Sequence, residues 1–278
     1  MPELAEVEHA RGVLERLAAG REVTDAWCAD DSIVVHGTTA DAVVSALLGS
    51  RIAGAGRWGK HLWIELEGGP SVLLHFGMTG AIRTPGDDPI ELETSGREID
   101  RTWPPRFCKL HFTLDDGTRL GFVNARRLGR IRLRADPRGE PPISKLGFDP
   151  LIELPDKAEF AKRVKRRRIP IKALLLDQKF AAGVGNWIAD EVLYQSKIRP
   201  RRRADRLRLY EVERLRVTIG EVVATAVAVD ARKDLFPEDW LFHRRWGKQK
   251  DATTVDGHPI RHDEIGGRTT AWVPDVQR

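Results

Sequence analysis

The sequence predicts an α+β protein with two domains: an N-terminal β-sandwich with flanking helices, and a C-terminal helical domain that ends in a β-hairpin. Three observations predict this class. Period-two alternation with Gly and Pro turns dominates the first half of the chain, apolar residues at helical spacing dominate the second half, and residues 135–150 have the proline and glycine content of a connector. A chain of 278 residues is long enough for two modest cores.

The amino end, MPELAEVEHA, predicts a helix over 3–17 that stops at Gly20. Proline suits the first turn of a helix because its missing N–H is not needed there, and acidic residues meet the positive end of the helix dipole. The same residues also have a chemical interpretation. Removal of Met1 would expose the secondary amine of Pro2 beside carboxylates, which is the equipment for Schiff-base chemistry.

Strand signals follow this helix. Residues 61–67 alternate apolar and polar side chains, 68–70 break the run, and 71–83 resume it. Residues 108–123 predict a second hairpin, which turns at Asp116-Gly117. Several short strands with turns at this spacing predict a two-sheet sandwich or a flattened barrel.

Helical periodicity begins after Pro170. We expect helices over 169–180, 187–198 and 207–227. Strand and turn signals return in the tail, from 246 to 273. The second domain is therefore expected to be helical up to this tail.

The glycine turn AAGVGNWIADE lies between two arginine-rich runs. Gly183 and Gly185 allow a ligand to approach the backbone closely, and Asn186 can cap the next helix, whose free N–H groups form a phosphate cradle. From 161 to 208 the chain has fifteen Lys and Arg against four Asp and Glu, although its net charge is only +5. A solvated charged face is the ordinary explanation of such a run. Its position around an apolar helix and a glycine turn favours nucleic acid as the partner.

Metal and membrane sites are not expected. The two cysteines, Cys28 and Cys108, exclude a disulfide framework and a zinc site built on two Cys-x-x-Cys pairs. His243, His258 and His262 lie in one stretch but lack helical or knuckle spacing. No run approaches the length of a membrane span and the amino end has no signal pattern, so we expect the cytosol or a compartment that holds nucleic acid.

Six segments, in colinear order over essentially the whole chain, carry a resemblance to a known family. They are MPELAEVE, GRWGKHLWIEL, LLHFGMTGAIR, NARRLG, IKALLLDQKFAAGVGNWIADEVLYQSKIRP and GGRTTAWVP. The chain thus resembles the formamidopyrimidine-DNA glycosylases, which are bifunctional repair enzymes with a helix-two-turn-helix motif. The resemblance implies a catalytic β-sandwich domain over 1–134, a linker over 135–150, a helix-two-turn-helix domain over 151–245 and a finger hairpin over 246–278.

The resemblance implies four residues at the reacting sugar. Pro2, after loss of Met1, would be the nucleophile on C1′, and Glu3 would donate a proton to the ring oxygen of the sugar. Glu6 matches a glutamate that orients the site, and it is grouped with the DNA-binding residues. Lys60 matches the lysine assigned to phosphate contact and proton transfer during elimination, although an exposed hairpin lysine is its ordinary interpretation. An α-amino group has a pKa of about 8, so it is neutral more often than a lysine side chain.

Other matching residues are expected to contact DNA. Candidate phosphate contacts around the lesion are His75, Arg167, Lys172, Asn186 and Arg268, of which Arg268 is grouped with the catalytic residues. Met78, Arg126 and Leu128 match the three residues that fill the gap left by the everted nucleotide.

The chain departs from the family pattern in its tail, which lacks the four zinc cysteines, as in zincless, plant-like members. Leu128 also stands where phenylalanine is usual, and Ala5 where a second proline is common. Residues 230–248 do not match the loop that covers oxoguanine in the zinc-bearing enzymes.

The resemblance implies a DNA glycosylase with AP lyase activity that removes oxidised purines and then cleaves the strand by β,δ-elimination. We expect formamidopyrimidines and hydantoins to be better substrates than oxoguanine, a monomer acting on damaged duplex DNA, no cofactor, and no membrane. The place of action would be the bacterial nucleoid or the eukaryotic nucleus. Two alternatives remain open: an endonuclease VIII-like enzyme for oxidised pyrimidines, and a damaged-DNA-binding protein with a silent active site.

Overall fold

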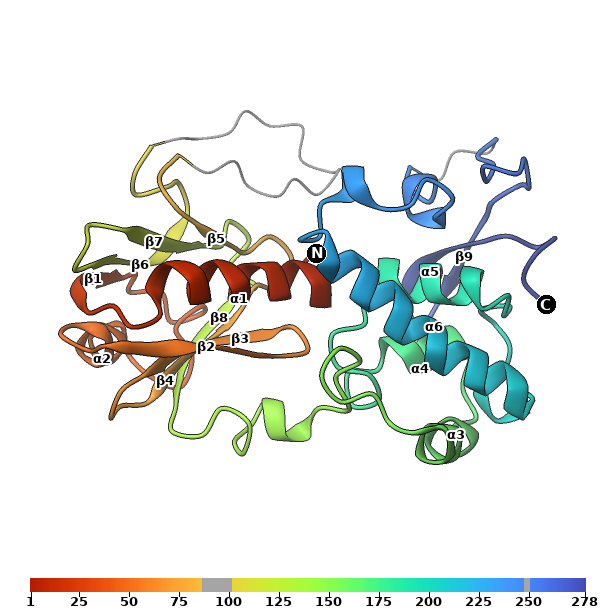
Figure 1. Ribbon diagram of the computed structural model, residues 1–278, viewed down its shortest axis with the longest axis horizontal. Coiled ribbons are helices and arrows are strands. Elements are labelled where there is room, and N and C mark those ends of the chain that lie inside the picture. Colours follow the sequence, from red (N-terminus) through yellow and green to blue (C-terminus); the bar gives the residue numbers. More distant parts are fainter. Residues whose placement is uncertain (87–101, 248–250) are drawn as a thin grey trace. The chain divides into compact units, whose positions relative to one another are not determined.

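The computed structural model describes residues 1–86, 102–247 and 251–278. The chain divides into two compact units, Met1–Lys145 and Leu146–Arg278, called unit 1 and unit 2 below. The boundary falls within the stretch 135–150 that the sequence indicates as a connector. Figure 1 labels the helices and strands along the chain.

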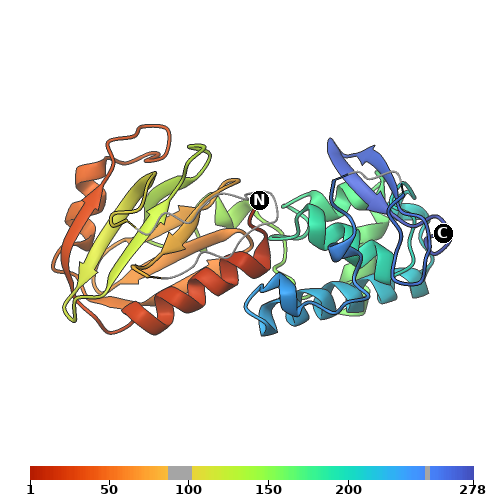
Figure 2. The same cartoon turned by 90° about the horizontal axis from the view of Figure 1, so that it is seen from above.

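Unit 1 is a sandwich of two four-stranded antiparallel sheets, and this agrees with the predicted fold class. One sheet has the order β1-β6-β7-β5 and the other β2-β3-β4-β8. Figure 2 shows these strands in layers, with α1 running along them. The strands are β1 Val23–Cys28, β2 Ile52–Trp58, β3 His61–Leu66, β4 Ser71–His75, β5 Ala81–Arg83, β6 Cys108–Leu114, β7 Arg119–Val123 and β8 Arg130–Arg134.

The core of unit 1 follows from the alternation along its strands. Leu62 and Ile64 of β3 are fully buried, as are Leu110 of β6 and Ile131 of β8. Because alternate side chains of a strand point to opposite faces, the apolar set of each sheet meets that of the other. Each such side chain stabilises the fold by roughly 1.5–3 kcal/mol.

Two helices flank the sandwich. α1, Leu4–Ala18, packs against β2 and β3, and α2, Ala40–Leu47, packs against β1. The sequence predicts the first helix one residue too early, because Glu3 is its cap. Pro2 therefore precedes the helix instead of lying in its first turn, and no part of the helical backbone depends on its nitrogen.

Unit 2 is helical and ends in a two-stranded hairpin. Its helices are α3 Lys157–Lys165, α4 Ile171–Leu176, α5 Asn186–Gln195 and α6 Leu209–Ala228, and its strands are β9 Arg261–Ile265 and β10 Arg268–Trp272. α4 is shorter than the predicted helix over 169–180 because the chain turns after it. Gln178 builds this turn, since its amide donates to Val184 O at 2.8 Å and accepts from Gly183 N at 3.0 Å.

α5 is the centre of unit 2. Its side chains Trp187, Ile188, Val192 and Leu193 are buried, and it contacts α4, α6 and β10. In the described ranges of the chain, no helix is long and apolar enough to cross a membrane.

Candidate active site

Two carboxylates lie at the start of α1. Glu3 is 2% exposed, and its backbone N–H donates to Glu6 Oε2 at 3.0 Å in a capping box. Burial, and secondly the nearby Glu3, raise the pKa of Glu6 to about 7. Two carboxyl groups in one desolvated place cannot both ionise easily. This end of the helix therefore retains a proton close to neutral pH.

The amino end of the chain lies among four charged residues. Burial lowers the pKa of the Met1 amino group, while Glu3 and Glu6 oppose this shift and Lys60 and Arg126 add to it. These groups are thus within electrostatic reach of the amine. Pro2, the next residue, is buried. The structure accordingly brings Glu3, Glu6 and Lys60 together around the place where a Pro2 amine would be.

Lys60 is held there by an ion pair that the sequence does not reveal. It follows Gly59 in the turn between β2 and β3, and the fully buried side chain of Arg57 spans from this turn to α1. Arg57 Nε donates to Glu8 Oε2 at 2.7 Å and its Nη1 donates to Gly59 O at 3.1 Å. The sequence places several glutamates on this helix and gives no sign that Glu8 pairs with an arginine 49 residues away.

His75 is placed at the end of β4, beside His61 of β3. The two rings lie 4.8 Å apart, and burial lowers the pKa of His75 to about 4 and that of His61 to about 3. Gly77 N–H donates to His75 Nδ1 at 3.2 Å, so the proton of the neutral ring is on Nε2. His75 can thus donate one hydrogen bond to an oxygen such as that of a phosphate without carrying charge.

The structure also brings together the three residues expected to fill the gap in DNA. Arg126 Nη1 lies 3.8 Å from Met78 Sδ. Gly77, next to Met78, has φ +61° and packs so tightly that a Cβ atom would lie 2.5 Å from the carbonyl carbon of Leu128. The two loops are therefore in direct backbone contact, and Leu128 is 46% exposed at this place.

Asn124 is hydrogen-bonded to both of these loops, the one that contains Met78 and the one that contains Leu128. It is fully buried, its Nδ2 donates to Phe76 O at 2.9 Å, and its Oδ1 accepts from Gly129 N at 2.9 Å. One side chain thus satisfies buried backbone groups at the base of both loops. The sequence gives no sign of this role for Asn124, although the segment NARRLG contains it.

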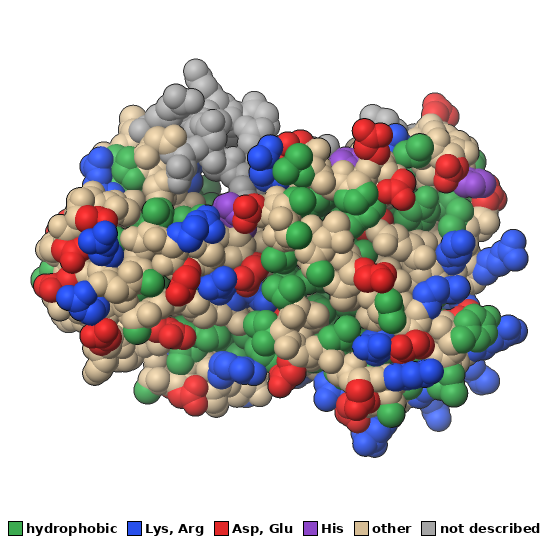
Figure 3. All heavy atoms as spheres, viewed as in Figure 1, with side chains coloured by type: hydrophobic (Ala, Val, Ile, Leu, Met, Phe, Trp, Pro, Cys, Tyr) green, Lys and Arg blue, Asp and Glu red, His purple; other side chains and the backbone are tan. Residues whose placement is uncertain are grey.

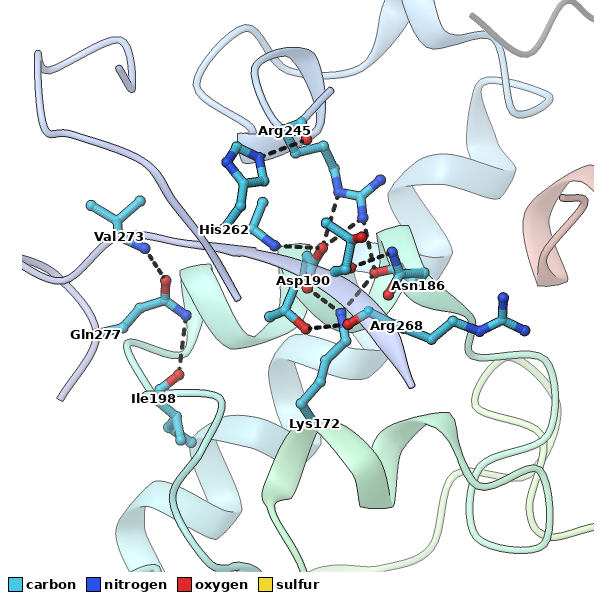
Figure 4. A network of polar contacts seen from close by, with 12 residues as sticks. Lys172, Asn186, Asp190, Ile198, Arg245, His262, Arg268, Val273 and Gln277 are labelled. Atoms are coloured by element: carbon cyan, nitrogen blue, oxygen red, sulfur yellow. Dashed lines mark hydrogen bonds and ion pairs between the residues drawn. The ribbon is translucent and has the colours of Figure 1, made fainter. Parts of the chain in front are cut away.

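In unit 2, Asn186 and Arg268 lie on adjacent elements (Figure 4). Asn186 is the first residue of α5, and Gly185 is the cap, which corrects the expectation that Asn186 caps this helix. Its Nδ2 instead donates to Thr269 O of β10 at 2.8 Å. Arg268 starts β10, is exposed, and extends away from the polar network around Asn186. The start of α5 is thus hydrogen-bonded to the start of β10.

Lys172 does not fit the expected phosphate contact. Its side chain has no exposed surface and its ammonium pairs with Asp190, which is equally buried. It also donates to Asn186 O at 3.1 Å. The sequence shows a lysine in a basic region, but only tertiary packing places this lysine inside. The expectation that Lys172 contacts a DNA phosphate is therefore replaced by a structural role, in which Lys172 supports Asn186 from inside the unit.

Arg167 fits an exposed contact. It follows α3 in the run KRVKRRR and is exposed, as are its neighbours Arg166 and Arg168. Figure 3 shows Lys and Arg side chains gathered over the end of unit 2 that carries α3. This surface has the charge that a nucleic-acid backbone requires.

The three histidines near the tail have separate partners. His243 Nε2 lies 3.3 Å from Phe236 O, His262 Nε2 lies 3.2 Å from Arg245 O, and His258 Nδ1 lies 3.7 Å from Asp275. In the part of the chain that the structure describes, no group of three or more His, Cys, Asp or Glu residues could hold a metal ion.

Residues 230–247, the described part of the segment 230–248, form an aromatic cluster on α5. Phe242 contacts Trp187 edge to face at 5.2 Å between centroids and Phe236 at 4.9 Å. Glu191 accepts Phe242 N–H at 2.8 Å, and burial raises the pKa of this carboxyl to about 7. The segment is therefore packed on its own unit by aromatic contacts and a buried hydrogen bond.

Two family models match the chain. The formamidopyrimidine-DNA glycosylase N-terminal domain matches residues 1–131, and the formamidopyrimidine-DNA glycosylase H2TH domain matches residues 146–235. Curated proteins named formamidopyrimidine-DNA glycosylase are similar over all of this chain. The one from Arabidopsis thaliana is 42% identical, with 71% of its own length covered, and the one from Listeria monocytogenes serotype 4b is 31% identical, with 100% covered.

Solved structures of the same type share the fold. The Lactococcus lactis formamidopyrimidine-DNA glycosylase non-covalently bound to DNA with an AP site has a TM-score of 0.81 and 24% identity, over 99% of each chain. MutM in complex with DNA that contains carbocyclic 8-oxo-G has a TM-score of 0.81 and 25% identity, over 100% of each chain.

Proposed function

Because the chain belongs to the formamidopyrimidine-DNA glycosylase family, we propose that it excises oxidised purines from duplex DNA with Pro2 as the nucleophile and then cuts the strand by β,δ-elimination. The protein is a DNA glycosylase and AP lyase of base excision repair. One arrangement carries the proposed chemistry: Pro2 is buried directly before Glu3, whose N–H donates to Glu6 Oε2 at 3.0 Å, and Lys60 and Arg126 help to lower the pKa of the amine at this end of the chain.

The first step needs a neutral amine. After removal of Met1, the lone pair of the Pro2 nitrogen forms a bond to C1′ while the bond from C1′ to the damaged base breaks. Burial lowers the pKa of the Met1 amino group, and the adjacent Pro2 is buried too, so the free base of the Pro2 amine should be favoured in the same way. The proton of the amine leaves with the departing base, and the lone pair of the nitrogen then forms an iminium ion when the bond from C1′ to the ring oxygen breaks in the second step.

The second step opens the sugar. A proton moves to the ring oxygen as the bond from C1′ to that oxygen breaks, and Glu3 is the donor that we propose. Glu6, hydrogen-bonded to the backbone of Glu3, holds a proton up to a pH of about 7 and can resupply the pair. Removal of a C2′ proton next expels the 3′ phosphate, and a second elimination expels the 5′ phosphate, with Lys60 as the proposed proton carrier.

The DNA contacts follow from exposure and hydrogen-bonding capacity. We assign the gap-filling role to Met78, Arg126 and Leu128, whose loops are in contact. We assign phosphate contacts to His75, Arg167, Asn186 and Arg268, and we propose that the protein acts as a monomer wherever chromosomal DNA lies. The structure of MutM in complex with DNA that contains carbocyclic 8-oxo-G supports a DNA substrate.

Borohydride trapping tests the proposal. The purified protein is incubated with duplexes that carry a formamidopyrimidine, a hydantoin, oxoguanine, thymine glycol or an abasic site, and the trapped complex is analysed by intact mass and peptide mapping. We expect a covalent adduct on Pro2 with the purine lesions. Preferred trapping on thymine glycol would support the endonuclease VIII-like alternative, and binding without any trapping would support a silent enzyme.

A further inference from the structure

A buried ionic cluster lies beneath the start of α5 in unit 2 (Figure 4). Asp190 is the carboxylate to which both cations of the cluster are paired, and it has no exposed surface. Asp190 Oδ1 accepts from Lys172, and Oδ2 accepts from Arg245 Nη2 at 2.6 Å and from Ala271 N–H at 3.2 Å. One aspartate therefore gathers two cations and a backbone donor.

Among the residues that the structure describes, the ion pairs of the cluster join two cations, Lys172 and Arg245, to one carboxylate, Asp190, and the Arg245 side chain is only 5% exposed. Both cations also donate to Asn186 O, Lys172 at 3.1 Å and Arg245 at 3.5 Å. Two cations are therefore buried next to the first residue of α5. They add to the positive end of the helix dipole there.

The cluster joins elements that are distant in sequence. Lys172 belongs to α4, Asp190 to α5 and Ala271 to β10, while Arg245 lies between α6 and the hairpin. His262 of β9 is hydrogen-bonded to the carbonyl group of Arg245 at 3.2 Å. Strand β9 is therefore bonded to Arg245, and strand β10 is bonded to Asp190, the ion-pair partner of Arg245.

These connections bear directly on two proposed DNA contacts. Asn186 shares its carbonyl with both cations, and its side chain donates to Thr269 O, next to Arg268. Ala271, which is held by Asp190, is three residues further along the same strand. The place of Arg268 relative to α5 thus depends on the cluster. The planar guanidinium of Arg245 fixes this geometry better than a flexible ammonium could.

We propose that Arg245 and Asp190 are positioning residues for DNA phosphate binding, which hold Asn186 and Arg268 in one electropositive site without touching DNA themselves. This inference rests on the proposed function, because it requires that Asn186 and Arg268 contact phosphates. Ion pairs inside proteins often add little stability compared with apolar replacements, and fixed geometry is an established use for them.

The salt dependence of DNA binding tests this role. Log affinity falls with log salt concentration by about 0.9 for each phosphate neutralised. Because the Arg245 side chain is buried, it cannot itself neutralise a phosphate. In the full-length Arg245→Met variant, we expect the slope to fall by about 1 to 2 and the affinity for an abasic-site duplex to fall by about tenfold or more. The single-turnover rate at saturating DNA should fall less than the affinity.

Arg216→Met is the matched control. Arg216 donates to Glu213 at 3.0 and 2.8 Å on α6, so this change removes an equal charge and a two-bond arginine pair from the same unit. We expect its salt slope to equal that of the wild type. If both variants lower the slope equally, net charge explains the effect and the proposal is wrong.

Arg245→Lys is the conservative variant. It keeps the charge and can still bond to Asp190, but a single ammonium cannot reproduce the fork that reaches Asn186 O as well. We expect an affinity between those of the wild type and Arg245→Met. If thermal unfolding shows that Arg245→Met is not folded, this variant decides the question: wild-type affinity and slope in folded Arg245→Lys would overturn the proposal, as would a wild-type slope in folded Arg245→Met.

The two failures can be told apart. If the wild type itself neither binds lesion duplexes nor forms a trapped complex, the proposed function is wrong. If the wild type does both and the Arg245 variants match it in slope and affinity, only the positioning role is wrong.

Discussion

Arg127 donates two hydrogen bonds to Asp31, from Nε to Oδ2 at 2.9 Å and from Nη2 to Oδ1 at 2.8 Å. Arg127 has φ +53°, a left-handed conformation that is unusual for a residue other than glycine. It lies between Arg126 and Leu128, and its side chain bonds back to the protein while the side chains of these two neighbours are exposed. The Arg127 guanidinium holds the pKa of Asp31 well below its usual range.

Asp31→Asn should weaken gap filling. Asn keeps the shape of the side chain but loses the charge that attracts Arg127 and Lys109, which donates to Asp31 at 2.9 Å. Small misplacements of a site can lower rates by up to about a hundredfold, and we expect about a tenfold slower eversion. Stopped-flow fluorescence of 2-aminopurine beside the lesion measures this step. Asp116→Asn, in the β6–β7 turn, is the control, and an eversion rate equal to that of the wild type would contradict the prediction.

Glu6→Gln should make the protein more stable at alkaline pH. The pKa of Glu6 is about 7 in the folded chain, above its value of about 4.5 in an unfolded chain. The folded chain therefore holds the Glu6 proton more tightly than the unfolded chain does. The contribution of Glu6 to the free energy of unfolding is highest below a pH of about 4.5, and it falls as the pH rises through about 7. Gln keeps an acceptor for the Glu3 N–H and cannot ionise. Urea unfolding should show a gain of about 1 to 3 kcal/mol at pH 8 and a much smaller gain at pH 5. An equal effect at both pH values would show that ionisation of Glu6 is not the cause.

Pro2→Gly should abolish most base excision while DNA binding stays nearly unchanged. The change replaces the secondary amine that we propose as nucleophile but leaves Glu3 as the cap of α1. Single-turnover excision and gel-shift affinity measure the two effects separately. Intact mass of the wild type should show that Met1 is absent. Retention of Met1 in protein that still forms a trapped complex would be incompatible with the Pro2 mechanism.

Lys60→Ala should slow sugar processing more than it weakens binding. Lys60 is held near the amino end by the pair of Arg57 and Glu8, so its loss removes the proposed proton carrier without altering the core. Strand cleavage of an abasic-site duplex isolates this step, because no base has to be removed. Lys145→Ala, at an exposed lysine of the same unit, is the control. A normal cleavage rate for Lys60→Ala would remove this residue from the mechanism.

Formamidopyrimidines, hydantoins and abasic sites should be processed faster than oxoguanine opposite cytosine. Leu128 lacks the aromatic stacking that contributes about 1–3 kcal/mol per base, and residues 230–247 are packed on α5 through aromatic contacts. Lesions that pair and stack almost normally should suffer most. Leu128→Phe should raise the rate on oxoguanine relative to a hydantoin in single-turnover assays. Oxoguanine excised by the wild type as fast as a hydantoin would refute the expected order.

The sequence predicts those elements whose pattern is local and strong. The strands β3, β4, β6 and β7 and the helices α1, α5 and α6 follow from apolar alternation or helical spacing, which depend only on near neighbours. Two short helices, α2 and α3, are missed. The second half of α3 lies in a run whose positive charge predicts an exposed surface, and a helix of nine residues gives little periodicity.

By itself, the sequence determined the two-unit organisation, the acidic start of the first helix and the concentration of positive charge in the second half, because each is a property of consecutive residues. Only the tertiary structure decided which polar groups are buried and which meet. Asp31 and Arg127 are 96 residues apart and Asp190 and Arg245 are 55 apart, and no local pattern relates them. Lys172 shows the difference most clearly, because a basic residue in a basic region is directed to the interior by the single carboxylate of Asp190. A buried charge needs a partner, and packing of distant elements supplies it.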